Sequence, residues 1–262
     1  PMILRAILGP QAKSETYVPF ETASYGDLSL KNSAHHIEKV TPSCTLRYFP
    51  KRIEDCIEWA RNYFNELFID PIIKLKKIIK ETNYFELLKN GSDEKDNVLI
   101  LVKLLKLVNQ NNIESILENS IKIFLENFTL WAKKVLKEYP LDKKKEDGTD
   151  FWDNNKIKPS KVEFNFDDNL CKTFAINYTK ILSDILEIEY QNNELIFQLK
   201  KMSEKNYLDE CIKEIENDEE LYEKDNSKIL LNKFEELYDN LIKNEEIKNK
   251  VLNYKIIELK KD

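Results

Sequence analysis

Glycine and proline are distributed so unevenly along this chain that they constrain its fold more than any other feature. The 262 residues include only four glycines, and neither glycine nor proline occurs after Pro159. Because these residues are the strongest helix breakers, the last hundred residues are predicted to be almost uninterrupted helix. Six of the eight prolines lie in the first 71 residues, which predicts extended chain and loop there, with residues 16–20 as a candidate strand. The predicted fold is therefore mainly α with a short extended N-terminal region.

The clearest helix is predicted to begin at Pro50, because proline is tolerated in the first helical turn, and to end at Pro71. Within it, apolar residues recur at three- and four-residue intervals and form one apolar face: Ile53, Ile57, Ala60, Phe64, Leu67 and Phe68. Further helices are predicted over residues 72–89, 97–109, 113–138 and 169–190, and on to about 250. For residues 192–250 two arrangements stay open, a long helical hairpin packed on the rest and an arm that binds a partner.

Composition and charge exclude several classes of function. A net charge of -6 and a pI near 5.3 argue against a nucleic-acid-binding protein, because neutralising phosphates requires a basic face. The sequence has neither the long apolar run of a membrane span nor the pattern of a signal peptide, so we expect an intracellular chain with no membrane partner. The glycines lie too far apart for a phosphate-binding loop, and the cysteines and histidines lack metal-ligand spacing. We therefore expect neither bound nucleotide nor metal.

The remaining chemistry is that of cysteine, and Cys44 has the local setting of a nucleophile. It lies between Pro42 and Pro50, in a segment that leads into a helix start, and Arg47 adds a nearby cation. Both features favour the thiolate, although spacing alone leaves open an inert loop cysteine. Cys56, in contrast, falls on or beside the apolar face of the following helix and is predicted to be a buried packing residue. We expect Cys44 to be the most readily alkylated thiol in the chain.

Residues 44–68, CTLRYFPKRIEDCIEWARNYFNELF, resemble the segment around the catalytic cysteine of ubiquitin-activating enzymes, which runs C-T-L-[KR]-x-F-P, then I-E or I-D, then W-A-[RK]-x-x-F. The matching residues are Cys44, Thr45, Leu46, Arg47, Phe49, Pro50, Ile53, Glu54, Trp59, Ala60, Arg61 and Phe64. Upstream, VPFETASY is similar to the family's V-P-F-x-T-x-S-Y. Further on, YPLDKKKEDGTDFW is similar to F-P-x-D, a spacer and G-x-x-F-W, followed by the family's spacing of Lys156, Pro159 and Phe164.

The chain also departs from the family pattern. Gly9 is the only glycine kept from the family's G-T-x-G-x-K-G run, Asp55 stands where histidine is usual, and Cys56 stands where threonine is usual. These departures leave the nucleophile in place but put the identity of the modifier in doubt. A divergent enzyme for a ubiquitin-like protein, or for an organelle, would have such a sequence.

The resemblance implies both a domain organisation and an activity. Residues 1–43 would be the crossover from an adenylation domain, 44–250 the helical catalytic-cysteine domain (the second catalytic cysteine half-domain), and 251–262 a strand returning to the adenylation domain. Cys44 would accept ubiquitin or a ubiquitin-like protein from its acyl-adenylate as a thioester and pass it to a ubiquitin-conjugating enzyme. ATP and Mg²⁺ would act in the adenylation domain, outside this chain, and no cofactor is expected within it. The expected compartment is the cytoplasm, the nucleus or both, with an organelle as the alternative.

Two residues beside Cys44 are candidates to support it. Thr45 would position or polarise the thioester carbonyl, and its alternative role is to cap the helix. Arg47 would favour the thiolate or stabilise the oxyanion, and its alternative is to be a solvated surface charge. The aromatic residues that match the family are expected to be core residues: Trp59, Phe64, Trp131, Phe151 and Trp152. The charged run DKKKEDG is expected to be a solvated loop.

Two other functions remain open at this point. A helical scaffold without catalysis would have a buried, unreactive Cys44. A cysteine hydrolase would need His35 or His36 beside Cys44 as a general base. Both alternatives make predictions about the surroundings of Cys44 that differ from those of a thioester-forming domain.

Overall fold

The computed structural model describes the backbone of residues 2–8 and 11–17, and residues 52–81, 94–146, 148–153, 157–223 and 227–257. The chain divides into two compact units, Pro1–Thr45 and Leu46–Asp262. In the first unit, strands β1 (Met2–Leu8) and β2 (Gln11–Tyr17) form an antiparallel pair in which Leu8 lies opposite Gln11. The start of the chain is therefore extended, as predicted. Of the candidate strand at 16–20, the last three residues lie outside the described part.

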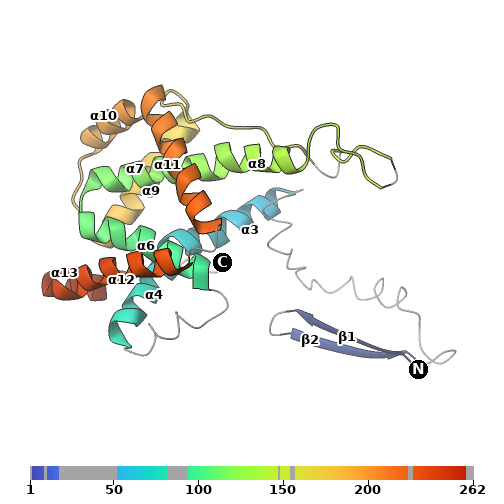
Figure 1. Cartoon of the computed structure of the whole chain (residues 1–262), viewed down its shortest axis with the longest axis horizontal. Coiled ribbons are helices and arrows are strands. Elements are labelled where there is room, and N and C mark those ends of the chain that lie inside the picture. Colours follow the sequence, from blue (N-terminus) through green and yellow to red (C-terminus); the bar gives the residue numbers. More distant parts are fainter. Residues whose placement is uncertain are drawn as a thin grey trace. The chain divides into compact units, whose positions relative to one another are not determined.

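The described part of the second unit is helical, which confirms the mainly α fold (Figure 1). Its elements in chain order are α3 (Ile53–Phe64), η2 (Asn65–Ile69), α4 (Asp70–Lys80), α6 (Glu94–Gln110), α7 (Ile113–Phe124), η3 (Leu125–Leu130), α8 (Trp131–Glu138), α9 (Asn169–Leu186), α10 (Asn192–Met202), α11 (Lys205–Glu223), α12 (Ser227–Lys243) and α13 (Glu245–Asn253). The elements η2 and η3 are π-helical segments within longer helices.

Local sequence explains where several helices begin and end. The side chain of Asn112 accepts a hydrogen bond from the backbone N–H of Ser115 at the start of α7 (2.8 Å). Asp168 does the same for Leu170 and Cys171 at the start of α9. At the other end of α9, Glu187 adopts a left-handed conformation with φ of 54°, which is a common way to terminate a helix.

Pro71 does not end the first helix, contrary to the sequence prediction. It lies in the first turn of α4, directly after the π-helical segment η2, and the chain stays helical from Ile53 to Lys80. In η2 the backbone bonds shift to a five-residue spacing, as in the bond from the Asp70 N–H to the Asn65 carbonyl. A proline is tolerated at this point because the start of a new α-helical segment does not need its missing N–H.

Within the described residues, most buried apolar side chains belong to one of two clusters. One is built around α6 and involves α4, α9, α12 and α13, with Leu75, Leu101, Leu105 and Phe234 among its least exposed members. The other joins α7, η3, α9, α10 and α11. Helices α7 and α9 pack against each other and contribute to both clusters, so they connect the two halves of this unit.

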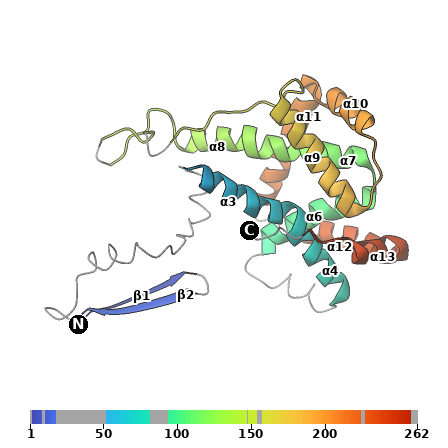
Figure 2. The ribbon, with the colours of Figure 1, turned by 180° about the vertical axis from the view of Figure 1, so that it is seen from behind.

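In the described part of residues 192–250, four successive helices, α10 to α13, pack on the rest of the unit and form neither a single hairpin nor an arm. Figure 1 shows α12 lying along α6 and α10 at the opposite end of the unit, while α11 runs from the α10 end back toward the middle of the unit. Figure 2 shows the same arrangement from behind, with α9 crossing α7. Helix α13 continues to Asn253, so the first residues of the predicted return strand are helical, and residues 258–262 lie outside the described part.

The loop after α8 holds its own small aromatic cluster. The Tyr139 and Phe151 rings stack with centroids 4.7 Å apart, the Trp152 indole N–H donates to the Tyr139 carbonyl (3.1 Å), and the Lys143 ammonium lies over the Tyr139 ring. Phe151 is thus buried as predicted, but in this local cluster and in neither of the two main ones. The described part of the DKKKEDG run is mostly exposed, which confirms the solvated loop.

Candidate functional site

The residues assigned from the sequence motif lie just before the described part of the second unit. Cys44, Thr45 and Arg47 fall outside the described residues, as do His35 and His36. Their roles therefore stay predictions. The structure does describe α3, the helix that begins at Ile53 and into which the Cys44 segment leads.

Asp55 closes the first turn of α3. Its carboxylate accepts a hydrogen bond from the backbone N–H of Arg52 (3.0 Å), and the Arg52 guanidinium lies 3.6 Å from the other carboxylate oxygen. The Asp55 side chain is mostly buried, whereas Arg52 is exposed. A carboxylate in the first turn also complements the positive end of the helix dipole. Asp55 thus fixes the start of the helix that follows the Cys44 segment in the sequence.

The first half of α3 does not bury its apolar face, contrary to prediction. Ile53 and Ile57 are 68% and 62% exposed, and both Ala60 and Cys56 are also exposed. The sequence prediction of Cys56 as a buried packing residue is therefore wrong. The physical reason is that periodicity shows which face of a helix is apolar, but not whether another element lies opposite that face.

The second half of α3 and η2 anchor the helix in the core. The Trp59 and Tyr63 rings stack with centroids 5.1 Å apart, and Phe68 contacts the rings of Phe64 and Tyr178 at 4.9 and 5.1 Å. Trp59 and Phe64 are half-buried, while Phe68 is buried. Such aromatic contacts hold the helix against α9 and bury much of its apolar surface.

Two partly buried hydrogen bonds complete this anchor. The Asn127 side-chain amide donates to the Tyr63 hydroxyl (2.6 Å), which ties α3 to η3, and the Asn119 amide donates to the Tyr178 hydroxyl (2.7 Å), which ties α7 to α9. Burial raises the pKa of Tyr178, with a smaller contribution from Tyr63, so its hydroxyl stays protonated at neutral pH. The sequence offered no signal for these pairs, because their partners lie about sixty residues apart and share no motif.

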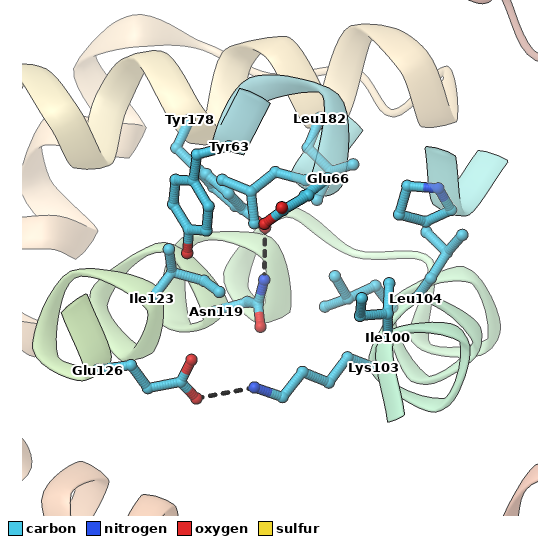
Figure 3. A pocket seen from close by; sticks show the side chains of 13 residues that line it. Tyr63, Glu66, Ile100, Lys103, Leu104, Asn119, Ile123, Glu126, Tyr178 and Leu182 are labelled. Atoms are coloured by element: carbon cyan, nitrogen blue, oxygen red, sulfur yellow. Dashed lines mark hydrogen bonds and ion pairs between the residues drawn. The ribbon is translucent and has the colours of Figure 1, made fainter. Parts of the chain in front are cut away.

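A cavity of about 160 Å³ lies beneath η2 (Figure 3). Its walls come from α3, η2, α4, α6, α7, η3 and α9, so both π-helical segments line it. Two polar interactions lie in its wall, the Lys103–Glu126 ion pair (2.8 Å) and the Asn119–Tyr178 hydrogen bond. Figure 3 draws both as dashed lines. A space of this size holds a few waters or a molecule no larger than a single ring.

The two cysteines of the later helices are poor nucleophiles. Cys171 in α9 and Cys211 in α11 are both buried. Burial raises the pKa of both thiols, that of Cys211 to about 11, so at neutral pH each is almost entirely protonated. Among the cysteines that the structure describes, only Cys56 is exposed.

Within the described residues there is no group of three or more His, Cys, Asp or Glu side chains placed to hold a metal ion. In the same part of the chain, no helix combines the length and the apolar character needed to span a membrane.

The family of the chain follows from its similarity to known proteins. The model of the ubiquitin-activating enzyme SCCH domain matches residues 50–262, which is most of the chain and all of the helical part described above. The chain therefore belongs to the family of ubiquitin-activating enzyme SCCH domains.

Individual relatives agree with this assignment. The chain is 28% identical to ubiquitin-activating enzyme E1 1 of Candida albicans over 209 residues, which is 78% of this chain and 19% of that protein. It is 28% identical to ubiquitin-activating enzyme E1 1 of Schizosaccharomyces pombe over 63% of this chain and 16% of that protein. It is also 25% identical to human ubiquitin-like modifier-activating enzyme 6, over 74% of this chain and 18% of that protein. The chain thus spans less than a fifth of the length of these relatives.

Proposed function

We propose that this chain performs the thioester half-reaction of a ubiquitin-activating enzyme, with Cys44 as the acceptor. The proposal is supported most directly by the CTLRYFP segment that begins at Cys44 and ends at Pro50, where the match to the SCCH family begins. The substrate would be ubiquitin or a ubiquitin-like protein, presented as its acyl-adenylate.

The proposed reaction needs little help from the protein. The Cys44 thiolate attacks the carbonyl carbon of the modifier's C-terminal acyl-adenylate and forms a carbon–sulfur bond. The bond from that carbon to the phosphate oxygen breaks, and AMP leaves with the electron pair, while the thiol proton has passed to water. Because the acyl-adenylate is a reactive electrophile and cysteine a good nucleophile, no histidine base is required. This suits a chain whose only histidines are His35 and His36.

The matched motif continues from the Cys44 segment into α3, which begins at Ile53. The ring contacts of Phe68 and the hydrogen bond from Asn127 to Tyr63 hold α3 firmly at its far end. In this proposal Thr45 positions the thioester carbonyl, and Arg47 stabilises the thiolate and the oxyanion.

The partners follow from the same proposal. An adenylation domain outside this chain would use ATP and Mg²⁺ to activate the modifier and release pyrophosphate. The thioester on Cys44 would then be attacked by the cysteine thiolate of a ubiquitin-conjugating enzyme. That step forms a new carbon–sulfur bond and regenerates the Cys44 thiolate. The cytoplasm or nucleus is the proposed compartment.

The substitution Cys44→Ser tests the proposal in an enzyme that joins this chain to an adenylation domain. A serine hydroxyl is barely ionised at neutral pH, and any adduct it forms is an oxyester that resists thiols. The variant should keep modifier-dependent ATP–pyrophosphate exchange and lose the thiol-sensitive adduct and all transfer to a conjugating enzyme. Gel analysis with and without a reducing thiol follows the adduct.

The matched control is Cys56→Ser, the same substitution at a cysteine that is exposed on α3. It should form the thiol-sensitive adduct at the wild-type rate. A Cys44→Ser enzyme that still formed such an adduct would contradict the assignment of the nucleophile. Loss of pyrophosphate exchange in that variant would contradict the separation of adenylation from this chain.

A further inference from the structure

The cavity beneath η2 fits a single ring in its size and in the character of its wall. Its volume of about 160 Å³ is close to that of an apolar protein cavity of about 150 Å³ that holds one benzene molecule. The apolar side chains of its described wall include Leu67, Ile100, Leu104, Ile123 and Leu182. The π-helical segments η2 and η3 also supply part of this wall, and such segments are frequent at functional sites.

Two groups in the described wall have hydrogen-bonding capacity left. Tyr178 is only 6% exposed, and its hydroxyl oxygen accepts a hydrogen bond from the Asn119 amide (2.7 Å). Among the described residues, no atom accepts the Tyr178 hydroxyl proton, and none donates to the side-chain carbonyl oxygen of Asn119. Figure 3 shows that carbonyl oxygen directed away from Tyr178, on the side of the Lys103–Glu126 pair. A ligand hydroxyl matches both groups, because it accepts one hydrogen bond and donates another.

The charges in the wall favour a neutral ligand. The Lys103 ammonium lies 2.8 Å from a Glu126 carboxylate oxygen, so these two charges largely balance each other. Glu66, the other acidic side chain of the described wall, has an interaction of its own. The Lys103 and Glu126 side chains are 35% and 26% exposed, and Figure 3 shows them on the side of the cavity opposite Tyr63 and Tyr178. The ion pair therefore marks the side from which a small molecule would enter.

We propose that this cavity binds a small neutral phenol, a single aromatic ring that carries a hydroxyl group. The hydroxyl accepts the Tyr178 proton and donates to the Asn119 carbonyl, while the ring packs on the aliphatic side chains. An aromatic ring suits the wall because Tyr63 and Tyr178 also line it. Burial raises the pKa of Tyr178, so its hydroxyl stays a donor at neutral pH. This inference does not depend on the role of Cys44.

Titration of the full 262-residue chain with phenol, followed by saturation-transfer NMR of the ligand, tests the proposal. Toluene is titrated in parallel, because it has the same size and shape but no hydroxyl. Saturable binding of phenol is expected. Tyr178→Phe should weaken phenol binding by about tenfold, as expected for the loss of one hydrogen bond, and leave toluene binding unchanged. Ile100→Phe should abolish the binding of both compounds, because the larger side chain fills the cavity.

The matched control is Tyr238→Phe, which removes a tyrosine hydroxyl from α12 that donates to the Ile78 carbonyl (3.4 Å). It should bind phenol as the wild type does. Absence of saturable phenol binding to the wild type would overturn the proposal and leave the cavity to water. An equal loss of phenol and toluene binding in Tyr178→Phe, or an equal loss of phenol binding in the control, would also overturn it. Circular dichroism checks that each variant folds. If Tyr178→Phe does not fold, Ile100→Phe decides, and phenol binding to it at wild-type strength counts against the site.

Discussion

The two halves of α3 differ sharply, although both continue the same apolar pattern in the sequence. In the first half, Ile53 and Ile57 are 68% and 62% exposed. In the second half and the π-helical turn that follows, Phe68 is 5% exposed and contacts the rings of Phe64 and Tyr178. One helix thus has an anchored end and an end whose apolar face is open.

The difference teaches that burial depends on what lies opposite a helix and not on the helix alone. The second half faces α9 and η3, which supply Tyr178 and Asn127. The first half is fixed instead by its own cap, through the bond from the Arg52 N–H to Asp55. The apolar face at this end of the helix is therefore left exposed.

The largest contrast is expected in cysteine labelling. Iodoacetamide should label Cys56 on the open end of α3 far faster than Cys211, which is buried and has a pKa of about 11. At pH 8, three units below that pKa, only about one Cys211 thiol in a thousand is ionised. Labelling of Cys211 should therefore rise about tenfold per pH unit between pH 7 and 9. Peptide mapping measures both labelling rates. Equal rates for Cys56 and Cys211 would contradict the difference in exposure between them.

A smaller but still large contrast is expected in stability. Phe68→Ala removes a buried ring from the anchored end and should lower the free energy of unfolding by about 3–5 kcal/mol. Ile57→Ala, the matched truncation at the open end, should change it by less than about 0.5 kcal/mol. Urea denaturation followed by circular dichroism measures both. A large loss of unfolding free energy on Ile57→Ala would mean that the apolar face of the first half of α3 is covered by another part of the protein.

The smallest effect concerns the hydrogen bond from Asn127 to Tyr63. Tyr63→Phe should cost about 0.5–1.5 kcal/mol, because Asn127 keeps its other bond, to the Ile123 carbonyl at 2.8 Å. A double-mutant cycle with Asn127→Ala isolates the pair, and its coupling energy should be of the same size. If the two substitutions change the free energy of unfolding additively, the hydrogen bond does not stabilise the contact between α3 and η3.

Much of the fold could be predicted from the sequence, because helical periodicity is a local property. The predicted helix over 113–138 coincides with α7, η3 and α8, and that over 97–109 falls within α6. The sequence does not predict the π-helical segments, since no residue type marks the wider turn, and Pro71 therefore predicts a helix end where the chain in fact stays helical. The open face of Ile53 and Ile57 was missed because exposure is a tertiary property.

The candidate site likewise has a part that could be predicted from the sequence and a part that could not. Cys44 is predicted from a sequence motif, which needs no tertiary information, and its role stays a prediction. The side chains that anchor α3 could not be predicted from a motif, because Tyr63, Asn127 and Tyr178 come from three separate helical elements. Asp55 was noticed only as a departure from the family pattern, and its capping role became clear from its bond with Arg52.

Locating the attached modifier by mass spectrometry is the most direct test of the central claim, that the cysteine before α3 and not a cysteine on it carries the thioester. The adduct would be formed with ATP and modifier in an enzyme that joins this chain to an adenylation domain, kept at low pH without thiols and digested. The account predicts that the modifier's C-terminus is attached to the peptide containing Cys44, and that Cys56, although exposed, is unmodified. Attachment at Cys56 would contradict it.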